Sequence, residues 1–89
     1  MSIEKSKLLP GLKLEQYLAS VGKTAADYKY SGVYESLEAR NFCRSIDDVV
    51  AESLAGDVEA VIDYHTEIIP HGDGWFHQRA QGLALTRKK

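Results

Sequence analysis

Two β-rich segments on either side of one dense turn constrain this chain more than any other feature of its sequence. Val58–Ile69 is rich in β-branched residues and contains neither Gly nor Pro. Pro70–Gly74 has the sequence PHGDG, in which proline, aspartate and two glycines all favour a turn. Trp75–Arg87 then returns to a strand-like pattern. We therefore predict a β-hairpin in which Val58–Ile69 pairs antiparallel with Trp75–Thr86.

A turn centred near His71 predicts which residues of this hairpin face each other. One face of the sheet would carry polar and aromatic pairs, namely His65–His77, Asp63–Arg79 and Glu67–Trp75. The Asp63–Arg79 pair would be a favourable cross-strand ion pair. The opposite face would be small and apolar, with the pairs Ile62–Ala80, Ala60–Gly82 and Val58–Ala84.

The sequence between residues 45 and 56 predicts a short helix. Ser45 is a preferred N-cap residue, and Asp47 and Asp48 lie in the first turn, where the helix dipole favours carboxylates. Apolar residues then recur every three or four positions, and Gly56 is suited to end the helix. We predict a helix over Ile46–Ala55 that covers the small residues of the hairpin, namely Ala60, Ile62, Ala80, Gly82 and Ala84.

The first half of the chain gives weaker signals. Leu12–Val21 places apolar residues at helical spacing and Gly22 follows as a helix-ending residue, so periodicity alone predicts a helix there. Tyr28–Tyr34 is rich in aromatic and β-branched residues with a partial period of two, which predicts a strand. Ser36–Arg44 stays open between a helix and a break.

The composition favours one small domain over residues 1–89. The formal net charge is −2, so charge gives no reason to expect nucleic acid or an anionic membrane as a partner. No apolar run approaches the roughly 18 residues of a membrane span, and the charged N-terminus does not resemble a secretory signal.

Cys43 is the only cysteine, which excludes an intramolecular disulfide and fits a reducing, cytoplasmic location. A chain this short builds a small core, for which oligomerisation is a common remedy.

The histidines suggest a metal site. If His65 and His77 face each other, their Cβ atoms lie roughly 5 Å apart, and two imidazoles at that distance can share one metal ion. Asp63 or Glu67 on the same face would add an oxygen ligand, which points to a divalent transition metal such as zinc, copper or nickel as cofactor. The alternative is that these four residues are polar groups on a solvated or inter-subunit face. His71 at the turn is expected to be exposed.

Two other residues allow alternative interpretations. Cys43 is either a small buried hydrophobe or a reactive thiol whose thiolate is favoured by Arg40 and Arg44. Trp75 either caps the end of the core or lies on a mixed aromatic, apolar and charged sheet face. That face would carry the two strand histidines together with Val61, Leu83 and Leu85, and such a surface suits a protein partner.

Short motifs near both ends of the chain point to a known family. Near the N-terminus, Leu9–Leu14 (LPGLKL) is followed by Tyr17-Leu18 and then by Val21. The matching residues further along are Gly56 with Ala60–Ile62, Asp63-Tyr64-x-Thr66, the turn glycines Gly72 and Gly74, and Ala80-x-Gly82-x-Ala84-Leu85. Together these motifs resemble the YbjQ-type heavy-metal-binding family over about half of the chain.

This resemblance implies a particular fold and assembly. The fold would be α+β, with a small antiparallel β-sheet and one or two helices packed on one face. Leu12–Val21 would be the N-terminal strand, and we prefer this to the helix that periodicity indicates, because tertiary context often overrides a short pattern. Members of the family form ring-like homo-oligomers, typically pentamers, so a homo-oligomer is expected here.

Three functions remain open at this point. We expect a non-enzymatic homo-oligomer of the YbjQ type that binds a metal ion or a small ligand. The alternative is a protein-interaction module that uses its exposed sheet face. A small enzyme with a site between subunits has no catalytic constellation in the sequence to support it.

Overall fold

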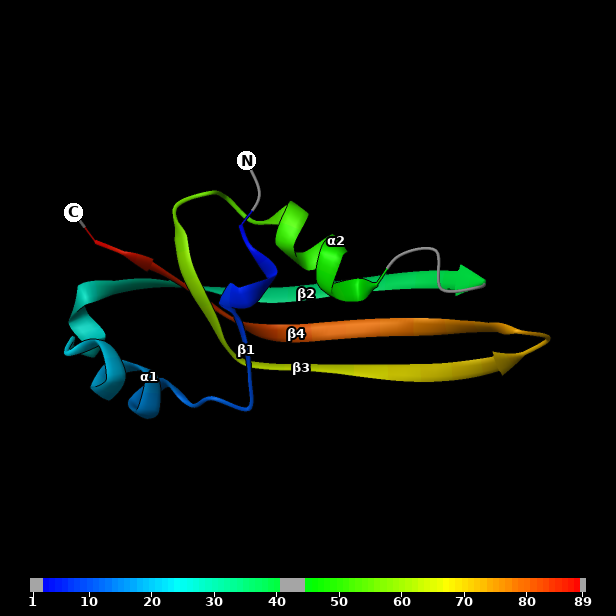
Figure 1. Ribbon diagram of the computed structural model, residues 1–89, viewed down its shortest axis with the longest axis horizontal. Helices are drawn as coiled ribbons and strands as arrows, with labels where there is room; N and C mark the ends of the chain where they lie inside the picture. The colour runs from blue at the N-terminus through cyan, green and yellow to red at the C-terminus, as the bar shows by residue number, and fades with distance from the viewer. Residues whose placement is uncertain (1–2, 41–44, 89) are drawn as a thin grey trace.

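A four-stranded β-sheet and two helices form the structure (Figure 1), a computed structural model that describes residues 3–40 and 45–88. The sheet order is β1-β3-β4-β2, in which β1 pairs parallel with β3 and the other neighbours are antiparallel. The elements in chain order are the 3-10 turn η1 (Lys5–Lys7), β1 (Leu8–Pro10), α1 (Leu14–Val21), the 3-10 turn η2 (Ala25–Asp27), β2 (Tyr28–Arg40), α2 (Ile46–Ser53), β3 (Val58–Gly72) and β4 (Trp75–Arg87). The predicted small α+β fold is confirmed, but the sheet is mixed rather than wholly antiparallel, because β1 pairs parallel with β3. The helices also pack on both faces of the sheet and not on one face as predicted.

β3 and β4 form the predicted antiparallel hairpin, but its turn lies later in the chain than expected. Gly72 pairs with Trp75, so Asp73 and Gly74 alone make the turn. Both have a positive φ, 54° and 77°, as a type I′ turn requires. The register predicted from a turn at His71 is therefore wrong, because the Asp-Gly dipeptide fits this tight turn better than the residues before it.

None of the residue pairs predicted from a turn at His71 is present in the observed register. Neither the His65–His77 pair nor the Asp63–Arg79 pair forms. Glu67 takes the place of Asp63, and its Oε1 lies 3.2 Å from Arg79 Nε. The observed pairs are Gly72–Trp75, Ile69–His77, Glu67–Arg79, Thr66–Ala80, His65–Gln81, Ile62–Leu83, Ala60–Leu85, Val61–Ala84 and Val58–Thr86.

A β-bulge at Asp63 changes which side chains of β3 share a face of the sheet. The pairing of β3 with β4 shifts between Ile62 and His65, so that Asp63 and Tyr64 both oppose Gly82. Asp63 adopts a positive φ of 48°, which aspartate tolerates better than most residues. Side chains before and after the bulge therefore point to faces that simple alternation does not predict.

Two apolar clusters pack on opposite faces of the sheet, one beneath α2 and the other beneath α1 (Figure 1). Ala84 and Leu85 are neighbours in β4 yet belong to different clusters, as side chains that alternate across a strand must. The buried residues beneath α2 are Ile3, Leu8, Val33, Ile46, Val50, Ala51, Val58, Val61, Tyr64, Ala80 and Ala84. Those beneath α1 are Tyr17, Tyr28, Ala60, Ile62 and Leu85.

The prediction of what α2 covers is therefore correct in part. Ala80 and Ala84 lie beneath α2 as expected. Ala60 and Ile62 lie beneath α1 instead, because the bulge at Asp63 reverses the facing of the residues that precede it.

α2 begins as predicted and is fixed to the sheet at its first turn. The Ser45 hydroxyl accepts a hydrogen bond from the Asp48 backbone N–H at 3.3 Å. Asp47 accepts a hydrogen bond of 2.6 Å from the Tyr64 hydroxyl, which ties the helix to β3 just after the bulge. The helix ends two positions earlier than predicted through an extended residue, so Gly56 does not take the expected capping role.

α1 corrects the expectation drawn from the family resemblance. Leu14–Val21 is a helix, as its periodicity indicates, and not the strand that the resemblance implied. Tyr17 and Leu18 pack against the sheet, and Gly22 ends the helix with a φ of 68°. The local pattern decides the structure here because it combines an apolar face to bury with a glycine that can adopt the left-handed conformation.

β2 contains the predicted strand Tyr28–Tyr34 and continues to Arg40. The open question over Ser36–Arg44 thus resolves into strand as far as Arg40, while Cys43 and both of its interpretations lie outside the described residues. None of the helices in the described part of the chain is long and apolar enough to cross a membrane.

Replacing Gly82 with alanine tests the bulge. A Cβ at Gly82 would lie 2.7 Å from Val61 Cγ1 and 3.2 Å from the Ile62 carbonyl oxygen. Val61 is fully buried and β-branched, so its side chain has little freedom to move aside. We expect Gly82→Ala to lower the free energy of unfolding by about 1–3 kcal/mol in urea denaturation.

Gly32→Ala is the matched control, because a Cβ at that glycine of β2 meets nothing within 4 Å. It should leave the free energy of unfolding unchanged or raise it by about 0.5–1 kcal/mol. Equal losses of stability from the two substitutions would contradict the tight packing at Gly82.

Candidate functional site

The face of the sheet opposite α2 presents its side chains in rows that run across three strands. α1 covers one end of this face, and we call the remainder the open face. The rows, each in the order β2–β4–β3, are Gly32–Leu83–Ile62, Tyr34–Gln81–His65, Ser36–Arg79–Glu67 and Glu38–His77–Ile69.

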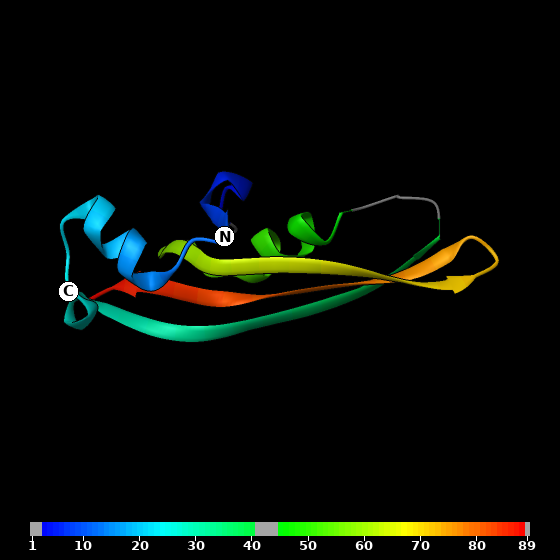
Figure 2. The same cartoon turned by 90° about the horizontal axis from the view of Figure 1, so that it is seen from below.

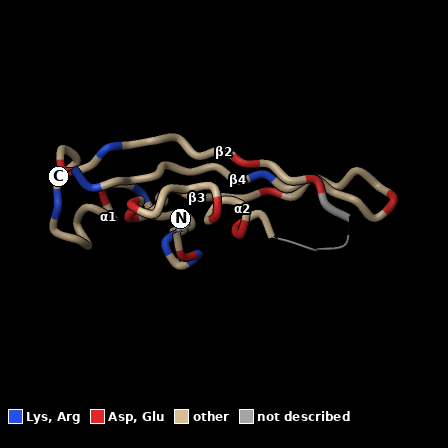
Figure 3. The backbone as a smooth tube through the Cα atoms, turned by 90° about the horizontal axis from the view of Figure 1, so that it is seen from above, with Lys and Arg blue, Asp and Glu red and all other residues tan. Residues whose placement is uncertain are grey.

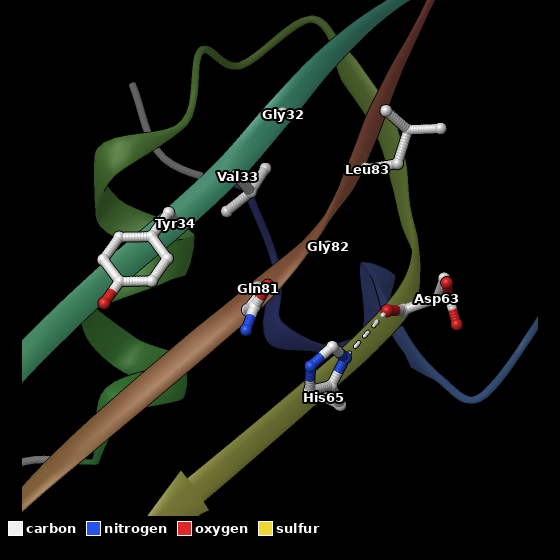
Figure 4. Close-up of a pocket in the computed structure, with 8 residues that line it drawn as sticks. All are labelled: Gly32, Val33, Tyr34, Asp63, His65, Gln81, Gly82 and Leu83. Atoms are coloured by element: carbon white, nitrogen blue, oxygen red, sulfur yellow. Dashed lines mark hydrogen bonds between the residues drawn. The ribbon is translucent and has the colours of Figure 1, made fainter.

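A groove of about 540 Å³ lies on the open face, a size typical of sites for small molecules. It is hollow at Gly32, which has no side chain to fill it. Figure 4 shows Tyr34, Gln81 and His65 side by side on the three strands, with Leu83 further along β4. The residues that line the groove are Gly32, Val33, Tyr34, Asp63, His65, Gln81, Gly82 and Leu83.

The groove offers hydrogen-bonding groups without a net charge. His65 Nδ1 lies 3.4 Å from the Asp63 carbonyl oxygen, which can only accept, so in the neutral imidazole this nitrogen donates and Nε2 is the acceptor. The Gln81 amide and the Tyr34 hydroxyl each both donate and accept. The Asp63 carboxylate lies 3.3 Å from Lys13 Nζ, and this ion pair neutralises it.

The predicted metal site does not assemble within this chain. The register separates His65 from His77 by four positions along the sheet, roughly 13 Å. Glu67 is paired with Arg79, and Asp63 is paired with a lysine. Within the described part of the chain, no three His, Cys, Asp or Glu side chains come close enough to hold a metal ion. The hypothesis depended on His65 and His77 facing each other, and this predicted pairing is wrong.

The far end of the open face carries an aromatic stack. The rings of His71 and Trp75 lie 4.3 Å apart at an angle of 14°, and the His77 ring lies 6.1 Å from that of His71. His71 is exposed, as predicted. Leu83 shares this face with Trp75, as the mixed-face hypothesis expected, whereas Leu85 is buried beneath α1 and Val61 lies beneath α2.

A largely buried carboxylate ties α1 to the other end of the sheet. Glu59 Oε2 accepts hydrogen bonds from the hydroxyls of Tyr17, at 2.6 Å, and Tyr28, at 2.5 Å. Glu59 Oε1 lies 2.6 Å from Arg87 Nη2. Burial by itself raises the pKa of Glu59, but the two hydroxyl donors and Arg87 outweigh burial and hold the pKa below its ordinary value. We call these four residues the Glu59 cluster.

The Glu59 cluster is a structural tie. Burial and the hydrogen bond to Glu59 raise the pKa of Tyr17, which keeps its hydroxyl protonated as a donor. Hydrogen bonds in the cluster join residues 31, 42 and 59 positions apart, which no periodic pattern in the sequence reveals. Sequence reasoning also missed Tyr34 and Gln81 at the groove. The alternation noted in Tyr28–Tyr34 is the signal that places Tyr34 and Gly32 on one face.

Replacing Glu59 with glutamine tests this tie through the pH dependence of stability. Because the pKa of Glu59 is lower in the folded than in the unfolded protein, its stabilisation is complete above the ordinary glutamate range and is lost as the pH falls through the folded pKa. We expect Glu59→Gln to lower the free energy of unfolding by about 1–3 kcal/mol at neutral pH. The difference from wild type should shrink as the pH falls below about 4.

Urea unfolding followed by circular dichroism across this pH range measures both effects. Glu15→Gln removes an exposed carboxylate from α1 and is the matched control, which should follow the wild-type curve. A deficit in Glu59→Gln that stays constant with pH would contradict the charged role of Glu59.

No protein-family model, no curated protein and no solved structure matches this chain. The resemblance to the YbjQ-type family therefore stays a prediction that depends on the short motifs alone.

Proposed function

We propose that this chain is a non-enzymatic binding protein that holds a small, planar, uncharged heteroaromatic molecule in the groove of the open face. The observation that carries this proposal is the hollow at Gly32, bordered by the cross-strand row Tyr34–Gln81–His65. The proposal keeps the small-ligand function expected from the sequence and replaces the metal with an organic molecule.

The shape of the groove supports a planar ligand. β2 and β4 pair without a break along it, so its floor is an even backbone surface. Tyr34 is 59% exposed, and stacking on such a ring contributes about 0.5–1.5 kcal/mol beyond the area it buries. Leu83 adds an apolar contact at the other side of the hollow.

The polar groups support a neutral ligand that has both donors and acceptors. The Gln81 amide, the Tyr34 hydroxyl and His65 Nε2 together offer both kinds of partner. The one carboxylate that lines the groove, Asp63, is paired with Lys13. A charged ligand would lose hydration in the groove without finding an opposite charge there, which is costly.

The lining residues support binding rather than a reaction. Among them, no serine, cysteine or lysine nucleophile stands beside a base, and the His65 ring is held by a backbone carbonyl. The single cysteine of the sequence supports a reducing, cytoplasmic location for this binding protein.

A protein-interaction module that uses the whole open face is the second candidate. It is favoured by aromatic groups that lie outside the groove, namely Tyr30, which is 41% exposed, and the stacked His71 and Trp75. Aromatic side chains on an otherwise polar surface are typical of protein interfaces.

Ligand-observed NMR with neutral fragments tests the small-molecule proposal. Indole, benzimidazole, adenine and caffeine are the probes, and cyclohexanol is the non-planar control. We expect at least one heteroaromatic probe to bind with millimolar or tighter affinity while cyclohexanol does not. The bound probe should shift the backbone amide signals of Gly32 and Gly82.

Filling the hollow supplies a matched pair of variants. Gly32→Val places a side chain in the groove, where a Cβ meets nothing within 4 Å, and it should weaken binding of the probe by about tenfold or more. Ser31→Val changes the neighbouring residue, which points to the other face, and should leave binding unchanged. Failure of all the probes to bind wild type, or equal binding by the two variants, would show the proposal to be wrong.

A further inference from the structure

The outer edge of β2 is the longest uncovered backbone edge in the fold. β2 has 13 residues, and it pairs with β4 at every position from Tyr28 opposite Arg87 to Arg40 opposite Trp75. Within the described part of the chain, its other side pairs with no strand. Figure 2 shows β2 as the outermost strand, with both helices on the other side of it. A long, regular edge of this kind is a ready template for another strand.

The opposite edge of the sheet is protected in ways that β2 is not. β1 covers β3 from Val61 to Tyr64, and β1 itself is short and ends in Pro10. Further along β3, Pro70 lacks the N–H that an added strand needs. The β2 sequence contains no proline, and the pairing of β2 with β4 contains no bulge. The edge of β2 is therefore the longer unbroken stretch for pairing.

We propose that β2 pairs antiparallel with β2 of a second copy of this chain, about a twofold axis at Gly32. Outward-facing backbone groups alternate along a strand, so a symmetric antiparallel pair must be centred on a residue. Centring it on Gly32 joins the two four-stranded sheets into one sheet of eight strands. Each copy then presents the same edge to the other, as a twofold interface requires.

The charges of β2 select this register. With Gly32 at the axis, Lys29 lies opposite the partner's Glu35, and symmetry makes this pair twice. Figure 3 shows a basic position near the start of β2 and acidic positions in its second half, which is the arrangement that antiparallel self-pairing needs. Moving the centre to Ser31 or Val33 replaces the partner of Lys29 with an apolar residue.

The aromatic residues select the same register on the open face. Tyr30 and Tyr34 are 41% and 59% exposed, and centring on Gly32 places each opposite the other residue of the partner. Aromatic pairs directly opposite each other stabilise neighbouring strands. Gly32 at the axis adds no side chain to either hollow, while Tyr34 belongs both to the groove and to the dimer contact. Because the mass measurement needs no ligand, it tests the dimer separately from the proposed ligand.

Charge reversal at β2 tests the proposal, with molar mass measured by sedimentation equilibrium. Wild type should approach twice 9.9 kDa as its concentration rises. Lys29→Glu and Glu35→Lys each place like charges opposite each other twice, and each should weaken the dimer by roughly tenfold or more. The double variant Lys29→Glu/Glu35→Lys restores opposite charges and should return the dimer towards wild-type affinity.

Glu15→Lys carries the same change of charge on α1, away from β2, and is the control that should remain dimeric. Circular dichroism confirms that each variant is folded before its mass is interpreted. A wild-type mass of 9.9 kDa at millimolar concentration would overturn the proposal, as would a pentamer. Single reversals without effect, or a double variant that stays as weak as the single ones, would overturn the register.

Discussion

The β-bulge at Asp63 is the constraint on which both cores and the groove depend. Simple alternation along β3 would place Ile62 and Tyr64 on the same face. The bulge leaves Tyr64 beneath α2, where its hydroxyl bonds Asp47, and turns Ile62 into the cluster beneath α1. The same shift places His65 at the edge of the groove. The bulge therefore decides which β3 side chains enter each of the two cores.

The two glycines that line the groove, Gly82 and Gly32, have different surroundings. Gly82 faces the bulge, where a Cβ would collide with Val61, so packing requires it. Gly32 lies in mid-strand with ordinary backbone angles and open space around it. A glycine in a strand costs about 0.5–1 kcal/mol relative to alanine, and no described residue lies close enough to a Cβ at Gly32 to require that cost. The proposed ligand site and the proposed twofold axis would each give a reason for it.

Local patterns predicted α2, the two hairpin strands and the first half of β2, and periodicity alone indicated α1. They did not predict β1, the rest of β2 or the pairing between strands distant in sequence. Both helices and the paired strands depend on residues close in sequence, which is why periodicity identified α1 correctly where a family resemblance did not. The register failed because Asp73-Gly74 forms a tighter hairpin turn than the proline-containing residues around His71, and the expected metal site failed with it. No pattern in the sequence around Asp63 indicates that a β-bulge forms there. The Glu59 cluster forms only once strands distant in sequence are side by side.

An edge strand binds a partner well only when it is ordered beforehand, because association otherwise includes the cost of ordering it. Several contacts within the single chain hold β2 in an ordered, extended conformation. Its first residue, Tyr28, is 1% exposed and bonded to Glu59, and Val33 in its middle is buried beneath α2. β4 holds its inner side throughout. The Glu59 cluster lies away from the groove, yet it fixes the start of β2 close to Gly32. In the proposed dimer it would keep this edge extended before a second copy pairs with it.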